Sequence, residues 1–257
     1  MQKQNALLLS TDTLVNYGLD RIFALTKEAW FDGIDLAMRK GFDARDEEYV
    51  QELSETYELP IGVIQTSNKL NQKEMDKALD LCELTGADTI AINAPKITDF
   101  KVYDFIADNL KTYQDANPQL KFTIINPTDS KLFALPIPEF RFANLIDIVK
   151  KHSAYLGLDI THLDMDTFEE NFVRKLEDYT PYISVLYFSD KNRKGRMHLV
   201  PWDGDLNLAN FLKKLKKSWY TIPISINIDF KPQELANREK ILSQLIKIRE
   251  FYEKNFQ

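Results

Sequence analysis

The residues best suited to proton transfer in this 257-residue chain lie in two stretches of its second half. Asp159 and His162 stand three positions apart, and Asp190 and His198 follow further along the chain. Imidazole is the side chain that changes charge near neutral pH, and a neighbouring carboxylate orients it. The chain has only 3 histidines, so this chemistry has few candidates. We predict Asp159, His162 and Asp190 as the catalytic acid–base residues.

Amide and cationic side chains stand where other apolar runs end. Amides, an arginine and carboxylates that converge on one opening are typical of a site for a polyhydroxylated or anionic ligand. The alternative is that these positions are polar only because they meet solvent. We predict the following substrate-binding residues: Arg39, Gln65, Asn93, Asn126, Lys191, His198 and Asn227.

A basic run precedes His198 and leaves two interpretations open. Lys191, Arg193, Lys194 and Arg196 either form an ordinary solvated loop or hold a phosphate or carboxylate group of the ligand. His198 lies in the same loop, where it is catalytic, anion-binding or merely exposed.

Eight short apolar runs, each followed by a helical pattern, must position these residues. Parallel strands that helices cover read as nearly continuous apolar runs. Eight strand–helix repeats in 257 residues predict a single α/β domain over residues 1–257, a (β/α)8 TIM barrel whose chemistry lies at the carboxyl ends of its strands. The runs are Ala6–Leu9, Gly33–Leu36, Ile61–Ile64, Thr89–Ile92, Phe122–Ile125, Leu156–Asp159, Ile183–Leu186 and Ile224–Asn227.

Local signals mark where helices begin and end. Asn71 with Glu74, and Asp166 with Glu169, have the spacing of an N-cap residue and its reciprocal carboxylate. Gly86 stands where a helix should end. Two connections, residues 126–140 and 190–208, are longer than the fold requires, and long loops after strands are often functional.

Composition narrows the class of protein. The net charge is −6, so the chain lacks the overall positive charge that is typical of nucleic-acid-binding proteins. No apolar stretch approaches the roughly 20 residues of a membrane span, and the amino terminus lacks the apolar core of a signal peptide. A lone cysteine, Cys82, is typical of a reducing compartment. We expect a cytoplasmic protein with no nucleic-acid or membrane partner; nothing in the sequence indicates its oligomeric state.

Four segments, taken in order, resemble the xylose isomerase-like barrel superfamily, which holds sugar phosphate isomerases/epimerases and endonuclease IV-type enzymes. Gly33–Leu36 is similar to its second strand, and Gly157–His162 to its D-x-x-H strand end. Tyr187–Asp190 resembles its H-x-x-D strand end, and His198–Gly204 the loop that usually ends in P-G-x-G. The resemblance spans nearly the whole chain and implies a small sugar or sugar phosphate as the ligand.

The same resemblance implies a divalent metal held by Glu, Asp, His and Glu on separate strands. Here Ile125, Tyr187 and Asn227 take three of these positions, and only Asp159 is kept. One carboxylate with an amide and a phenol is a poor set of ligands for a divalent ion. We therefore expect a degenerate metal site with no bound metal and no other cofactor. The 3 histidines also fall short of the three-metal set of endonuclease IV-type enzymes.

Three functions remain open at this point. The first is an isomerase/epimerase-like enzyme that no longer uses the metal. The second is a barrel that binds a sugar or anionic metabolite without turning it over. The third is a metal-dependent isomerase whose ligands lie elsewhere in the sequence.

Overall fold

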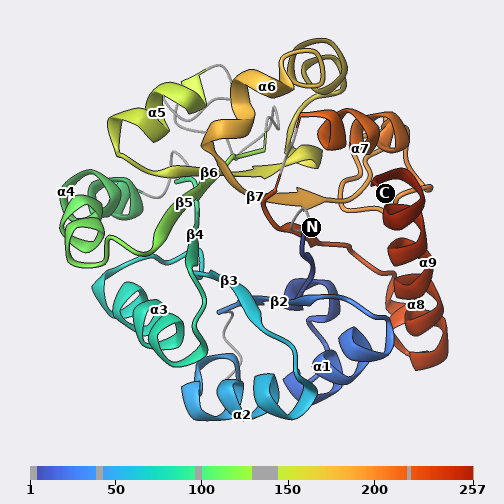
Figure 1. Cartoon of the computed structure of the whole chain (residues 1–257), viewed down its shortest axis with the longest axis horizontal. Coiled ribbons are helices and arrows are strands. Elements are labelled where there is room, and N and C mark those ends of the chain that lie inside the picture. Colours follow the sequence, from blue (N-terminus) through green and yellow to red (C-terminus); the bar gives the residue numbers. More distant parts are fainter. Residues whose placement is uncertain (1–4, 39–42, 96–99, 129–143, 219–220, 257) are drawn as a thin grey trace.

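The computed structural model describes residues 5–38, 43–95, 100–128, 144–218 and 221–256. Its centre is a closed barrel in which parallel strands β1 to β8 follow one another in chain order, as the sequence predicts (Figure 1). The strands are β1 Leu7–Ser10, β2 Gly33–Ala37, β3 Ile61–Gln65, β4 Thr89–Asn93, β5 Lys121–Ile125, β6 Tyr155–Asp159, β7 Ile183–Phe188 and β8 Ile224–Ile226.

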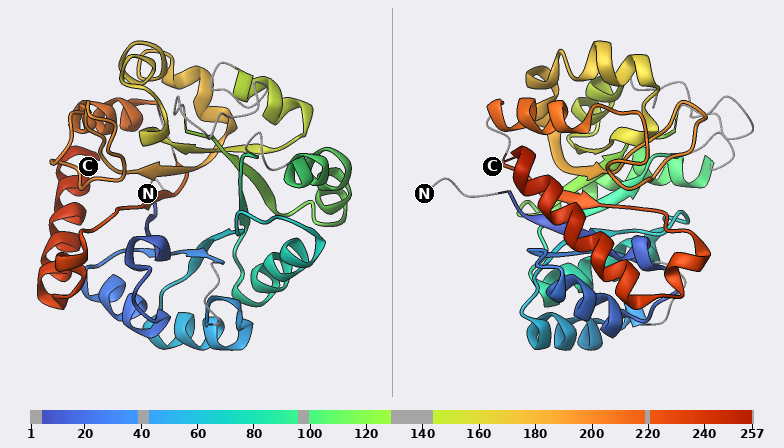
Figure 2. Two further views of the ribbon diagram at one scale, coloured as in Figure 1. Left: turned by 180° about the vertical axis from the view of Figure 1, so that it is seen from behind. Right: turned by 90° about the vertical axis from the view of Figure 1, so that its right-hand side faces the viewer.

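Helices surround the barrel on the outside, and the side view in Figure 2 shows the last of them running along one flank. They are α1 Leu19–Glu28, α2 Glu47–Tyr57, α3 Gln72–Thr85, α4 Phe100–Ala116, α5 Leu145–Lys151, α6 Leu176–Tyr179, α7 Leu208–Lys217, α8 Pro232–Leu235 and α9 Arg238–Phe256. None of the helices in the described ranges is long and apolar enough to cross a membrane.

Alternation along the strands divides the apolar side chains between two cores. Leu7 and Leu9 of β1 belong to the large core between the strands and the helices. Leu8 points into the barrel, where it packs with Val63 and Val185. A Cβ atom at Gly62 would lie 2.8 Å from Leu8 Cδ1, so a larger residue at this position would clash with the leucine side chain. The barrel interior is therefore filled below its mouth, and a ligand can enter only from an end.

The local helix signals have mixed outcomes. Asn71 caps α3 by accepting a hydrogen bond from the Glu74 amide at 3.0 Å, and Gly86 ends that helix with a φ of 74°. The second predicted cap is wrong, because Asp166 makes no capping hydrogen bond. Asp164 instead accepts from the amide and the hydroxyl of Thr167, where a π-helical turn begins.

Candidate functional site

A cavity of about 1180 Å³ opens at the carboxyl ends of the strands. Side chains from several strands line it, together with residues from the loops that follow β1, β2 and β3. Its size admits a small metabolite, and its position is where barrels of this kind carry their sites. The predicted residues that line it are Gln65, Asn93, Asp159, His162, His198 and Asn227.

Asp159, the last residue of β6, lines this cavity. Its Oδ1 accepts from the backbone amide of Thr161 at 2.9 Å and from the Thr161 hydroxyl at 2.7 Å. Asn126 fixes the backbone of Asp159: its Oδ1 accepts from the Asp159 amide and its Nδ2 donates to the Asp159 carbonyl. One carboxylate oxygen is thus held by hydrogen bonds, and the other, Oδ2, faces two imidazoles.

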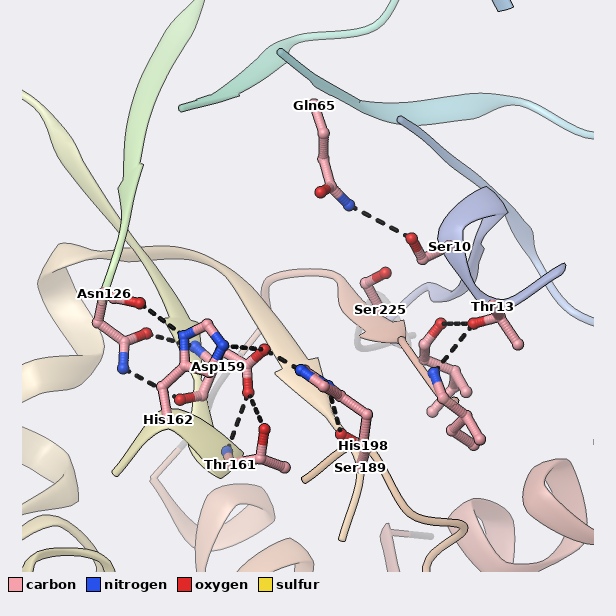
Figure 3. A network of polar contacts seen from close by, with 12 residues as sticks. Ser10, Thr13, Gln65, Asn126, Asp159, Thr161, His162, Ser189, His198 and Ser225 are labelled. Atoms are coloured by element: carbon pink, nitrogen blue, oxygen red, sulfur yellow. Dashed lines mark hydrogen bonds and ion pairs between the residues drawn. The ribbon is translucent and has the colours of Figure 1, made fainter. Parts of the chain in front are cut away.

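His162 presents its Nε2 atom to Asp159. The ring nitrogen Nδ1 lies 2.7 Å from the backbone carbonyl of Asn126. A carbonyl only accepts, so Nδ1 carries the hydrogen, and the neutral ring has its lone pair on Nε2. That Nε2 lies 3.6 Å from Asp159 Oδ2 (Figure 3). The ring is therefore oriented to exchange a proton through the atom nearest the carboxylate.

His198 reaches the same carboxylate from the loop after β7. Its Nδ1 lies 3.9 Å from Asp159 Oδ2 and 3.5 Å from Ser189 Oγ. The two imidazole rings meet edge to face, with their centroids 5.7 Å apart. His198 adopts a φ of 54°, a left-handed conformation that is uncommon outside glycine, and such strain often accompanies functional positions. Asp159, His162 and His198 form what we call the Asp–His–His cluster.

The charge of Asp159 is stabilised in this cluster despite its burial. Burial is the largest single influence and raises the pKa of the carboxyl. The two imidazoles of His162 and His198 and the hydrogen bonds from Thr161 act in the opposite direction. Together they outweigh burial, so the pKa of Asp159 lies below its ordinary value. An ionised carboxylate beside two rings is suited to stabilising an imidazolium.

Asp190, predicted as a third acid–base residue, does not line the cavity. Its Oδ1 accepts from the amides of Lys191 and Leu206, and its Oδ2 accepts from the amide of Gly204 at 3.0 Å. Its backbone pairs with Leu199 in both directions. Burial raises the pKa of Asp190, and these backbone hydrogen bonds oppose the increase. The contacts show Asp190 fastening the loop that carries His198.

The remaining predicted ligand contacts separate into three groups. Asn93 and Asn227 are half-buried at the cavity wall, and neither side chain is hydrogen-bonded to any described residue. Asn126 uses both ends of its amide on β6, and Lys191 donates to the Leu163 carbonyl at 2.6 Å; neither lines the cavity. Arg39 lies outside the described residues.

Two buried polar residues near the site are not among the predicted catalytic or substrate-binding residues. Asp35, in the middle of β2, is fully buried, and Tyr187 on β7 has a buried hydroxyl without a hydrogen-bond partner among the described residues. Burial, and then the charges of Asp35 and Asp159, raise the pKa of Tyr187 well above 10. For Asp35 the available signal was an acid within an apolar run, Gly33–Leu36, which indicated a strand and contributed to the family resemblance.

The four positions that the resemblance implies for a divalent metal do not fit one. Ile125 is apolar, the buried phenol of Tyr187 resists ionisation, and Asn227 offers only a neutral amide. A different group of side chains could hold a metal ion. Asp159, His162 and His198 each offer one ligand atom, and these atoms lie within 4.8 Å of one another. This set has the nitrogen and carboxylate donors that zinc and similar ions accept.

Comparisons with known proteins establish the fold. No family model matches the sequence, and no curated protein matches it. A xylose isomerase domain protein from Alicyclobacillus acidocaldarius is structurally similar, with 15% identity, a TM-score of 0.72, and 98% of each chain covered. This likeness shows that the two proteins share one fold, a (β/α)8 barrel, over nearly their whole length.

Two further solved structures of this fold differ in what their names say they do. The 3-keto-D-glucoside 4-epimerase of E. coli has 12% identity and a TM-score of 0.73, covering 96% of this chain and 100% of that one. AP endonuclease family 2 from Brucella melitensis has 16% identity and a TM-score of 0.71, covering 96% and 99%. The fold alone therefore leaves the chemistry open, and the site must decide it.

Proposed function

We propose that this protein binds a small sugar or sugar phosphate in the barrel mouth and catalyses an isomerase/epimerase-type proton transfer on it. The observation that carries the proposal is the Asp–His–His cluster, which lines the same cavity as the amide side chains of Asn93 and Asn227. Amide groups such as those of Asn93 and Asn227 both donate to and accept from sugar hydroxyls. The net charge of −6 argues against a nucleic acid as the ligand.

The chemistry follows from the orientation of the cluster. An isomerase of this type removes a proton from a carbon beside a carbonyl and returns it to a neighbouring carbon or to the other face, so no co-substrate is consumed. His162 Nε2 is the base in this scheme, because His162 lines the cavity and its other ring nitrogen is fixed by Asn126. In this proposal Asp159 stabilises the imidazolium that forms, and His198, which lines the same cavity, donates to the ligand oxygen that gains charge.

Deuterium incorporation tests this proposal directly. Chelator-treated protein is incubated in D2O with a panel of ketohexoses, aldohexoses and their phosphates, and proton NMR follows exchange beside the carbonyl. We expect exchange with at least one sugar and a loss on the order of 10²- to 10⁴-fold in His162→Gln. His152→Gln is the matched control, because His152 follows α5 and does not line the cavity. Exchange that persists unchanged in His162→Gln would contradict the proposal.

The same panel separates this proposal from a binding-only barrel. If the protein turns over no sugar but binds one, as ligand-detected NMR would show, the chain is a metabolite-binding barrel. If it neither exchanges nor binds any panel sugar, the sugar class itself is wrong.

A second candidate function, a metal-dependent isomerase, is favoured by the 4.8 Å grouping of the three cluster atoms. Elemental analysis after mild dialysis distinguishes the two. We expect well under one equivalent of Mn, Zn or Co. A full equivalent, lost on His198→Ala but not on His152→Ala, would replace the metal-free proposal with the second candidate.

A further inference from the structure

Asp35 lies in the barrel interior, where neighbouring strands supply apolar side chains such as Val63 and Ala91. It is 0% exposed and forms no ion pair with any residue in the described part of the chain. Its Oδ2 accepts from Gln65 Nε2 at 2.8 Å and from Ser225 Oγ at 2.5 Å. Its Oδ1 has no partner there. A buried carboxyl oxygen without a partner is costly, so its presence needs an explanation.

The contact with Gln65 fixes which end of that amide faces the ligand. Gln65 Nε2 has two hydrogens, and it donates to Asp35 Oδ2 and to Ser10 Oγ at 3.3 Å. Oδ2 already accepts from the Ser225 hydroxyl, so it serves as the acceptor oxygen of the carboxyl whether or not Oδ1 carries a proton. The opposite orientation would place Gln65 Oε1 against this acceptor and would lose both hydrogen bonds that Nε2 donates. Figure 3 shows the Gln65 oxygen turned away from Ser10.

The Gln65 oxygen is left available to the cavity. Gln65 lines the cavity, and its Oε1 neither accepts a hydrogen bond from a described residue nor is among the fully enclosed polar atoms that lack one. This differs from Asn93 and Asn227, whose unbonded amides can turn to offer either end. Gln65 therefore offers only an acceptor.

We infer that Asp35 is a positioning residue that determines ligand specificity: through Gln65 it presents a fixed hydrogen-bond acceptor, which selects a ligand with a hydroxyl donor at that point. The inference relies on the proposed function for the class of ligand, a polyhydroxylated sugar. It goes beyond that function by naming Gln65 Oε1 as the atom that accepts a hydrogen bond from one ligand hydroxyl, and Asp35 as the residue that orients Gln65.

The first experiment needs no ligand. Hydrogen exchange of the Gln65 side-chain amide, assigned by its loss in Gln65→Met, is followed by ¹⁵N NMR. We expect exchange at least tenfold slower than for the exposed Gln119, and a return to the Gln119 rate in Asp35→Leu. Asp35→Asn keeps a carbonyl acceptor at the same place and should preserve the protection. Gln65 exchanging as fast as Gln119 in the wild type would overturn the inference and leave the proposed function intact.

The second experiment measures selectivity with defined probes. Binding of D-fructose, D-tagatose and their 3-deoxy and 4-deoxy analogues is compared by NMR titration. In the wild type one deoxy analogue should bind about threefold to tenfold more weakly than its parent, the value of one neutral hydrogen bond. Gln65→Met, which is similar in size and lacks the acceptor, should lose this preference, and Asp35→Asn should keep it.

Each outcome of the second experiment bears on a separate claim. An unchanged preference in Gln65→Met would show that another group reads the hydroxyl, which overturns the inference. No binding of any probe to a wild type whose Gln65 amide is protected would overturn the sugar class, and the specificity role with it. If Asp35→Leu does not fold, the wild type and Asp35→Asn in the exchange experiment, with Gln65→Met in the titration, still decide the matter.

Discussion

His162 is held in the site through one ring nitrogen, Nδ1, which leaves the other, Nε2, for proton transfer. The Asn126 carbonyl holds Nδ1, and the same Asn126 side chain holds the backbone of Asp159. One residue, directly after β5, thus fixes both partners of the proposed acid–base pair. The predicted role of Asn126 as a ligand contact gives way in our proposal to this supporting role.

The tautomer of His162 can be measured directly. We predict that the neutral ring carries its hydrogen on Nδ1, because a backbone carbonyl at 2.7 Å can only accept. Long-range ¹H–¹⁵N correlation spectra at alkaline pH should show a protonated Nδ1 and an unprotonated Nε2, with His152 as the internal comparison. A hydrogen on Nε2 would contradict the geometry and remove His162 Nε2 as the base.

The loop from Asp190 to Leu206 is the element that delivers His198. The three amide contacts to the Asp190 carboxylate fold this loop back on itself, and the Asp229 amide donates to the His198 carbonyl at 2.8 Å. His198 is therefore placed by backbone contacts on both sides.

Gly204→Ala tests this loop. A Cβ atom at Gly204 would lie 2.3 Å from Asp190 Oδ1 and 2.7 Å from the Lys191 carbonyl, so the loop must shift. We predict a loss of about 1–3 kcal/mol of stability and a reduced exchange rate in D2O, since His198 moves with the loop. Gly18→Ala, where an added Cβ meets nothing within 4 Å, is the control for both thermal denaturation and exchange. Equal behaviour of the two variants would show that Asp190 does not position His198.

Four strands meet at the positions that the family resemblance assigns to a metal. Asp159 and Tyr187 are paired across β6 and β7, and Ile125 and Asn227 line the same cavity. We predict that Ile125→Glu, Tyr187→His and Asn227→Glu together create a site with ligand distances of about 2.0–2.2 Å. The triple variant should gain thermal stability with Mn or Zn, because an ion that binds only the folded state stabilises it.

The controls for this variant are the wild type and the three single variants. Each single change should give little response, because one or two ligands bind weakly. A triple variant that folds, by circular dichroism, but shows no shift with either metal would mean that these side chains do not converge. A shift in the wild type would instead favour the metal-dependent candidate.

The barrel as a whole was predictable because its strands are buried on both faces and so read as apolar runs. The proximity of Asp159 and His162 was predictable because the two stand three positions apart where a strand ends. The role of Asp190 was not, because its partners are backbone amides as far as 16 residues away. The role of Asp35 could not be predicted either, because it depends on a hydrogen bond from Ser225, 190 positions further along the chain. Only closure of the barrel brings these two residues together. Sequence patterns report local burial, whereas these contacts are tertiary.

Closure of the barrel around Asp35 also makes the stability of the molecule depend on pH. Burial, the largest influence, raises the pKa of this carboxyl from 3.8 to about 7, although the hydrogen bonds from Ser225 and Gln65 oppose it. Between these two values the unfolded chain has released the proton and the folded chain still holds it. At this group the folded protein then binds more protons than the unfolded chain, so the contribution of Asp35 to stability falls as pH rises from about 4 to about 7, and levels off above.

We predict that Asp35→Asn removes this dependence, because the amide does not titrate. Its thermal stability relative to the wild type should increase from pH 4.5 to pH 7 by on the order of a few kcal/mol, or several °C for a chain of this size, and stay constant above. Thermal denaturation of both proteins across this range, with the exposed Asp203→Asn as control, measures the difference. Parallel curves for wild type and Asp35→Asn would mean that Asp35 is ionised in the folded barrel. Gln65 would then face a permanent negative charge, which holds its amide more firmly and leaves the acceptor in the cavity unchanged.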